Sequence, residues 1–142
     1  MRTDTLPQTL TETQVHLIQS TWRSLEPAGT QVGQLFYQRL FELDPGLRAL
    51  FGPELRQQGD KLVAMLSAVV GGLGRLDALL PTVAALGQRH ARYGVTPAHY
   101  HDTVGQALLW TLQRGLRQAA TPPVMAAWSA AYGVLASAMQ TA

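Results

Sequence analysis

Two polar residues interrupt the apolar stripes of predicted helices, and a third lies beside such a stripe. Gln58 and His90 occupy positions that the helical repeat of their apolar neighbours directs inward, and Tyr37 borders a third stripe. A buried polar group is costly unless it finds a partner. Histidine can bind a metal, and glutamine and tyrosine can donate hydrogen bonds to a ligand. These three residues are therefore the candidates for chemistry.

Each candidate also has an ordinary structural explanation. His90 could donate to a backbone carbonyl in the core, and Gln58 could bind the end of a neighbouring helix. Tyr37 could be a core tyrosine with its hydroxyl in water. Taken singly, none of the three assigns a function. The other histidines are expected to be solvated and not to form a metal pair: His16, His99 and His101.

The elements that would position these residues are helices. Apolar residues recur at three- and four-residue steps, glycine and proline separate the segments, and no alternating strand pattern of convincing length occurs. Helices are predicted over residues 11–25, 30–43, 54–70, about 76–92, 96–117 and 121–142, with a short helical turn over 44–53. Thr11 and Gln14 form a predicted capping box, and Pro81 is expected in a first turn or a break.

The prediction is therefore an all-α domain of about seven helices over residues 11–142, preceded by a flexible tail over 1–10. With 46% hydrophobic and 14% charged residues the chain is expected to be globular, and its net charge of +2 is too small for nucleic-acid binding. No segment has the length of a signal peptide or a membrane span, so a cytoplasmic protein without membrane contact is expected.

Cysteine is absent, which removes disulfides, iron–sulfur clusters and thiolate-ligated haem. An iron or zinc ion would need histidine, carboxylate or tyrosine ligands. Charge is also absent from Ala119 to Ala142, an unusual property for a helix that faces solvent. This stretch predicts a homodimer that forms through the last helix.

Several stretches resemble the globin family, most of all bacterial single-domain globins, the globin part of flavohaemoglobins, and neuroglobin. The resemblance covers about residues 10–142, with order and spacing in agreement. The proximal-histidine region is matched by Leu86-Gly87-Gln88-Arg89-His90-Ala91-Arg92-Tyr93-Gly94-Val95 with His99-Tyr100, and the other matches are Leu35–Phe41, Leu50-Phe51 and Ala127–Gly133. A cofactor, and the residues that would hold it, are implied by this resemblance alone.

The resemblance implies a globin fold around haem b, with His90 as the proximal iron ligand. On the other side of the haem, Tyr37 and Gln58 would face the ligand and Leu62 would press on its site. Tyr100 would support His90. The remaining residues implied to contact the haem, with Leu62, are Phe51, Lys61, Leu86, Val95 and Val104.

The implied function is reversible binding of dioxygen or another diatomic gas. Dioxygen at such an iron acquires partial negative charge, so the Tyr37 hydroxyl and the Gln58 amide would each stabilise it by about 1.5–3 kcal/mol and slow its release. Carbon monoxide carries less charge and would gain less.

Two alternatives stay open. One is a nitric oxide dioxygenase, or another haem detoxification enzyme, that works with an external reductase. The flavohaemoglobin pattern backs the proximal histidine with a tyrosine and a glutamate; here Tyr100 matches the tyrosine, but no acidic residue follows Asp102 and no flavin domain is expected. The other alternative is a haem-free interaction module of globin shape, which would tolerate loss of His90.

Overall fold

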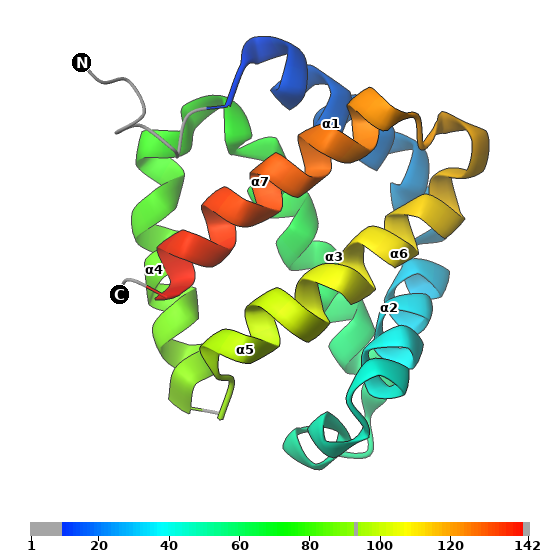
Figure 1. Ribbon diagram of the computed structural model, residues 1–142, viewed down its shortest axis with the longest axis vertical. Helices are drawn as coiled ribbons and strands as arrows, with labels where there is room; N and C mark the ends of the chain where they lie inside the picture. The colour runs from blue at the N-terminus through cyan, green and yellow to red at the C-terminus, as the bar shows by residue number, and fades with distance from the viewer. Residues whose placement is uncertain (1–9, 93, 141–142) are drawn as a thin grey trace.

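The computed structural model describes residues 10–92 and 94–140, and within them it consists of helices without a strand (Figure 1). The prediction of an all-α fold is confirmed, whereas residues 1–9 of the tail predicted over 1–10 lie outside the described part. The long helices are α1 (Glu12–Leu25), α2 (Gly29–Leu43), α3 (Leu55–Gly71), α4 (Leu76–Arg92), α6 (Gly105–Leu116) and α7 (Pro122–Gln140).

Short helical pieces connect these helices. Helix α5 (Pro97–His99) leads into a π-helical segment, Tyr100–Val104, which leads directly into α6. Four 3₁₀ turns complete the described part of the chain: Glu26–Ala28, Pro45–Leu50, Leu73–Arg75 and Arg117–Ala119. At the start of α1 the predicted capping box is confirmed, because the Gln14 N–H donates to Thr11 Oγ1 at 3.0 Å and the Thr11 N–H donates to Gln14 Oε1 at 2.9 Å.

A pair of buried tryptophans joins α1, α3 and α7 in the core. The rings of Trp22 and Trp128 meet edge to face, with centroids 6.1 Å apart. The Trp22 indole N–H donates to Ser67 Oγ at 2.9 Å, and the Trp128 indole N–H donates to Thr21 Oγ1 at 3.0 Å. Because both indole N–H groups have acceptors, the pair is buried without an unpaired donor.

Helices α2 and α3 cross with their backbones in contact. A Cβ at Gly33 would lie 2.9 Å from both the Cα and the main-chain oxygen of Gly59, which is closer than any side chain can fit. Glycine at position 33 therefore permits a crossing that a larger residue would push apart. Tyr37 lies one turn beyond Gly33 and Gln58 is adjacent to Gly59, so the crossing brings the segments that carry both residues together.

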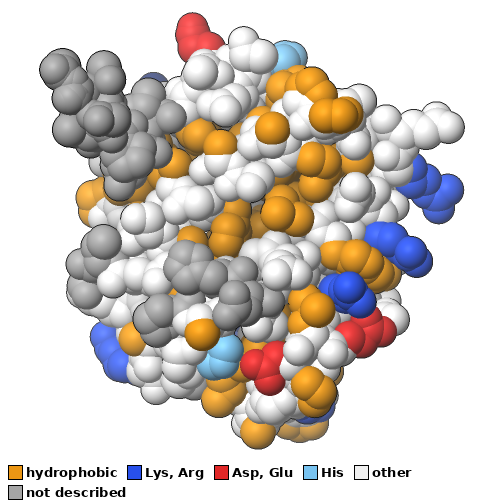
Figure 2. Space-filling view, in the orientation of Figure 1, with side chains coloured by type: hydrophobic (Ala, Val, Ile, Leu, Met, Phe, Trp, Pro, Cys, Tyr) orange, Lys and Arg blue, Asp and Glu red, His pale blue; other side chains and the backbone are white. Residues whose placement is uncertain are grey.

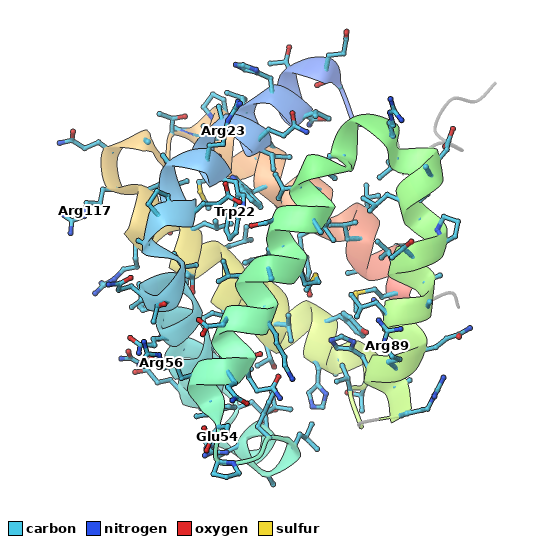
Figure 3. The ribbon with its side chains drawn as sticks, turned by 180° about the vertical axis from the view of Figure 1, so that it is seen from behind. Trp22, Arg23, Glu54, Arg56, Arg89 and Arg117 are labelled. Atoms are coloured by element: carbon cyan, nitrogen blue, oxygen red, sulfur yellow. The ribbon has the colours of Figure 1, made fainter. Side chains whose placement is uncertain are left out.

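Helices α3 and α4 follow each other in the chain but do not form a packed pair. Helix α3 packs mainly on α2, and α4 packs mainly on α7. The two helices meet at a bend of 52°, and Figure 3 shows their far ends, marked by Glu54 and Arg89, standing apart. Within the described residues no single helix has the length and apolar composition of a membrane span. The bent pair has that length and composition only when its two helices are taken together.

Two predicted details of the helices are wrong. The helix expected over residues 96–117 is divided into α5, the π-helical segment and α6, because the turn after Tyr100 is widened to five-residue hydrogen bonding. Pro81 lies inside α4 and not in its first turn or a break. The helix continues there because only one hydrogen bond, to the carbonyl of the exposed Asp77, is lost.

The crossing predicts opposite outcomes for its two glycines. Gly33→Ala should destabilise the protein by about 1–3 kcal/mol, since the new methyl group meets backbone that cannot move aside. Gly59→Ala is the matched control: its Cβ would lie 3.4 Å from the Gly33 Cα, an ordinary contact, and alanine favours a helix by up to about 1 kcal/mol. Urea unfolding of both variants measures the difference, and equal stabilities would contradict the crossing.

Candidate site between α2, α3 and α4

His90 lies in the last turn of α4, and its side chain is half-buried. Its ring Nδ1 is 2.8 Å from the main-chain oxygen of Leu86, one turn earlier. Because a carbonyl can only accept, Nδ1 carries the hydrogen, and Nε2 of the neutral ring keeps its lone pair. No residue in the described part of the chain makes a hydrogen bond to Nε2. His90 therefore has one nitrogen, Nδ1, in a hydrogen bond and one, Nε2, that is free to bind a metal.

An aromatic cluster lies at the end of α2. The ring of Tyr37 stacks on Phe41 with centroids 5.9 Å apart, and Phe51 meets both rings edge to face at 5.2 Å and 5.5 Å. Phe41 and Phe51 are only half-buried, although both pack against the core. The cluster therefore has partly exposed aromatic surface on which a planar apolar group could pack.

Tyr37 is buried, and this burial raises the pKa of its hydroxyl to about 12. The hydroxyl therefore keeps its proton at physiological pH and can act as a hydrogen-bond donor. Gln58 is half-buried near the start of α3, where its backbone N–H donates to the Glu54 carbonyl. Neither the Tyr37 hydroxyl nor the Gln58 amide side chain has a hydrogen-bond partner among residues 10–92 and 94–140, although both residues are partly removed from water.

The other predicted contact residues come from four segments. Lys61 and Leu62 lie on α3, Leu86 on α4, Val95 after α4, and Val104 at the end of the π-helical segment. Lys61 is exposed, whereas the four apolar residues are half-buried. Leu62, Val104 and Phe51 pack against the same core. Apolar side chains that remain partly exposed on several elements are compatible with an apolar binding site for a ligand.

Tyr100, the predicted support of His90, is buried in the π-helical segment, and this burial raises the pKa of its hydroxyl. Its main-chain oxygen accepts a hydrogen bond of 2.7 Å from the hydroxyl of Tyr132. No described residue joins the Tyr100 hydroxyl to His90. The sequence reasoning missed Tyr132 because it stands on the apolar stripe of the last helix, where a tyrosine has an ordinary packing role.

The prediction for His99 is wrong, because this residue is half-buried and not solvated. Its Nδ1 accepts the Thr96 N–H at 2.9 Å, and its Nε2 lies 3.8 Å from Asp44 Oδ2. His99 therefore closes the first turn of α5 and links it to the turn after α2. The spacing of three residues between Thr96 and His99 resembles a capping box and could have revealed the first contact. His16 is exposed as predicted, and the side chain of His101 lies outside the described part.

A separate cavity of about 720 Å³ lies between α1 and the connection from α3 to α4. Its walls include Val15, His16, Leu73 and Arg75, and none of the predicted site residues lines it. No three histidine, aspartate or glutamate side chains within the described residues gather into a metal site. A metal at His90 would therefore need most of its ligands from a group other than the protein, as a porphyrin provides.

Comparison with known proteins agrees with this arrangement. The family model for globins matches residues 34–139. The chain is 34% identical to a flavohemoprotein of Bacillus subtilis over 127 residues, which are 87% of this chain and 32% of the relative. It is 36% identical to a flavohemoprotein of Vibrio cholerae over 130 residues, which are 89% of this chain and 33% of the relative.

Two further comparisons cover nearly the whole of both proteins. The chain is 33% identical to neuroglobin of Chaenocephalus aceratus over 144 positions, covering 92% of this chain and 90% of the relative. A solved structure of an engineered carbene transferase, described as a "putative nitric oxide dioxygenase from Rhodothermus marinus", superimposes with a TM-score of 0.82. That structure is 28% identical and matches 94% of this chain and 92% of its own. The chain thus spans about a third of the two flavohemoproteins that it matches.

The buried hydroxyl of Tyr37 predicts a defined dependence on alkaline pH. Its pKa is raised from 10.0 to about 12 in the folded protein, so the stability it contributes is complete below pH 10 and is lost as the pH rises through about 12. Between these values unfolding releases a proton from Tyr37. At about pH 11, unfolding in urea increases the absorbance of tyrosinate. In Tyr37→Phe this increase should be smaller than in the wild type by the contribution of one tyrosine. An unchanged increase would mean that Tyr37 is accessible to water.

Proposed function

The chain belongs to the globin family, and on that basis we propose that it holds a haem b through His90 and binds dioxygen reversibly. Family membership implies haem binding, and the donor set of the site fits this group. His90 offers a single free nitrogen, and partly exposed apolar and aromatic side chains stand on several surrounding elements. The observation that carries the proposal is the hydrogen bond from His90 Nδ1 to Leu86, which leaves Nε2 for the iron.

When bound, the haem would supply an iron that is held by His90 and that can bind a diatomic gas. The neutral His90 ring is held in one orientation by its bond to Leu86, which maintains the lone pair of Nε2. Half-buried Phe51 would pack on the flat face of the porphyrin, and the ammonium of exposed Lys61 would bind a propionate. Leu62, Leu86, Val95 and Val104 would exclude water from the group.

Selectivity for dioxygen is assigned to Tyr37 and Gln58. Both are donors that lack a partner among the described residues, and burial keeps the Tyr37 hydroxyl protonated. A hydrogen bond to a charged acceptor contributes about 1.5–3 kcal/mol, so two such bonds would slow dioxygen release by on the order of a hundredfold or more. Carbon monoxide, with less charge, would be held less strongly. Slow release suits storage, delivery or sensing of the gas.

Nitric oxide dioxygenase activity is the second candidate. It is supported by the names of the relatives, which include two flavohemoproteins and a protein named after nitric oxide dioxygenases. Repeated turnover would require electrons from an external reductase. Sustained consumption of nitric oxide with a cellular reductase would favour this function, whereas a single reaction followed by arrest would favour oxygen binding. The cytoplasmic location stays a prediction from the sequence.

We also propose that α7 takes part in self-association. From Pro122 to Gln140 it carries no charged residue, and the side chains of Ala126 and Ser129 are exposed on it. In Figure 2, which has α7 on its near face, hydrophobic side chains are spread over the middle of that face while the blue Lys and Arg side chains lie toward its edge. The dimer stays a prediction, and a strictly monomeric sedimentation profile at high concentration would contradict it.

Absorption spectra of the purified protein test the proposed function directly. Wild-type protein supplied with haem should show the Soret band of a histidine-ligated haem and a reversible spectral change with dioxygen. His90→Ala should lose this ligation because the single free nitrogen is removed, and added imidazole should restore it. A His90→Ala variant with wild-type spectra would contradict the assignment. A wild-type protein without haem after reconstitution would support the haem-free alternative.

Tyr37→Phe tests the distal hydrogen bond. The variant keeps the aromatic ring and its packing but lacks the hydroxyl, so dioxygen dissociation should accelerate by about tenfold or more, whereas carbon monoxide dissociation should change much less. Stopped-flow replacement of each gas measures the two rates. Phe41→Tyr, which adds a hydroxyl at a neighbouring half-buried ring, is a matched control for changes of packing. Equal acceleration of both gases in Tyr37→Phe would show that no hydrogen bond discriminates between them.

A further inference from the structure

Helix α7 contacts two segments of the chain at or close to His90. One is α4, which carries His90, and the other is the π-helical segment Tyr100–Val104. Met139 takes part in the first contact and Tyr132 in the second. The two residues stand seven apart in α7 and therefore lie on the same face, two turns from each other. Figure 1 shows α7 extending from the upper part of the molecule to α4.

The contact at the π-helical segment is a hydrogen bond to the main chain. The Tyr100 oxygen accepts the N–H of Gly105, five residues on, and it also accepts the Tyr132 hydroxyl at 2.7 Å. A carbonyl has two lone pairs and can accept both. A Cβ at Gly105 would lie 2.7 Å from Tyr132 Cε2, so the glycine makes room for the ring. The second hydrogen bond stabilises a turn that is wider, and rarer, than an α-helical turn.

The contact at α4 is backbone against backbone. A Cβ at Gly87 would overlap the main-chain oxygen of Met139 and lie 2.5 Å from its Cα, so α4 rests directly on the last turns of α7. Gly87 follows Leu86, whose carbonyl orients the His90 ring. The turn of α4 that orients the His90 ring is therefore the turn that packs against α7.

We propose that Tyr132 is a positioning residue for His90. Helix α7 holds α4 at Gly87 and the π-helical segment at Tyr100, and in this way it sets the place of His90 relative to the wall that contains Tyr100 and Val104. Without the Tyr132 hydroxyl, the widened turn loses one of its two hydrogen bonds and can tighten toward an α-helical turn. Tyr100 and Val104 then shift against His90. This inference rests on the proposed function, since it concerns the histidine that would hold the haem.

The test is Tyr132→Phe in haem-loaded, ferrous protein. The phenylalanine keeps the ring beside Gly105 and removes only the hydroxyl. We expect the iron–histidine stretching frequency in resonance Raman spectra to shift, because the strain on His90 changes, while the Soret band and the melting temperature stay close to those of the wild type. The dioxygen dissociation rate should change by about two- to tenfold, the range that one hydrogen bond supplies.

Ser129→Ala is the matched control, since it removes a hydroxyl from the exposed face of the same helix and should leave the frequency unchanged. Gly105→Ala is a second variant: it displaces the Tyr132 ring without removing its hydroxyl and should also shift the frequency. A haem-loaded protein whose frequency is the same in wild type, Tyr132→Phe and Gly105→Ala overturns the positioning role alone. A wild-type protein that takes up no haem overturns the proposed function, and this inference with it.

Discussion

The close crossing of α2 and α3 is the constraint on which the site depends. The main chains of Gly33 and Gly59 touch, so α3 packs mainly on α2. Helix α3 therefore diverges from α4, the next long helix in the chain. Helix α4 is held on the other side by α7, through an equally close approach at Gly87. The protein thus uses glycine contacts to separate two consecutive helices, and in the proposed function the separated pair would supply two walls of the haem site.

The chemistry of the two walls differs in how their polar groups are satisfied. On α4, His90 makes one hydrogen bond within its own helix, which selects the nitrogen that keeps a lone pair. On α2 and α3, Tyr37 and Gln58 are partly removed from water without a partner among the described residues. Donors without a protein partner are available to hydrogen-bond a bound ligand that carries negative charge. This asymmetry suits the proposed combination of a fixed iron ligand at His90 with hydrogen-bond donors for a gas at Tyr37 and Gln58.

The third structural contribution comes from α7, which the sequence presents as an alanine-rich and uncharged helix. In the fold α7 packs against α4 at Gly87, and its Tyr132 hydroxyl donates a hydrogen bond to the main-chain oxygen of Tyr100 in the widened turn. The match to neuroglobin covers 92% of this chain. The match to the longer flavohemoprotein of Bacillus subtilis covers 87% of this chain. A helix that holds none of the predicted site residues thus contacts both α4, which carries His90, and the segment that carries Tyr100.

The sequence by itself determined the helices, the residue types of the site and the family. Helical periodicity located five of the long helices, the capping box at Thr11 was predicted correctly, and the glycines and prolines marked most breaks. These are local signals, carried by residues three or four apart. Only the tertiary structure decided which helices touch at their backbones, that the turn after Tyr100 is widened, that Pro81 is tolerated inside α4, and that His99 is engaged. The reason is physical: these features depend on contacts between residues that are distant in the chain or on small local hydrogen-bond changes, and neither leaves a periodic trace in the sequence.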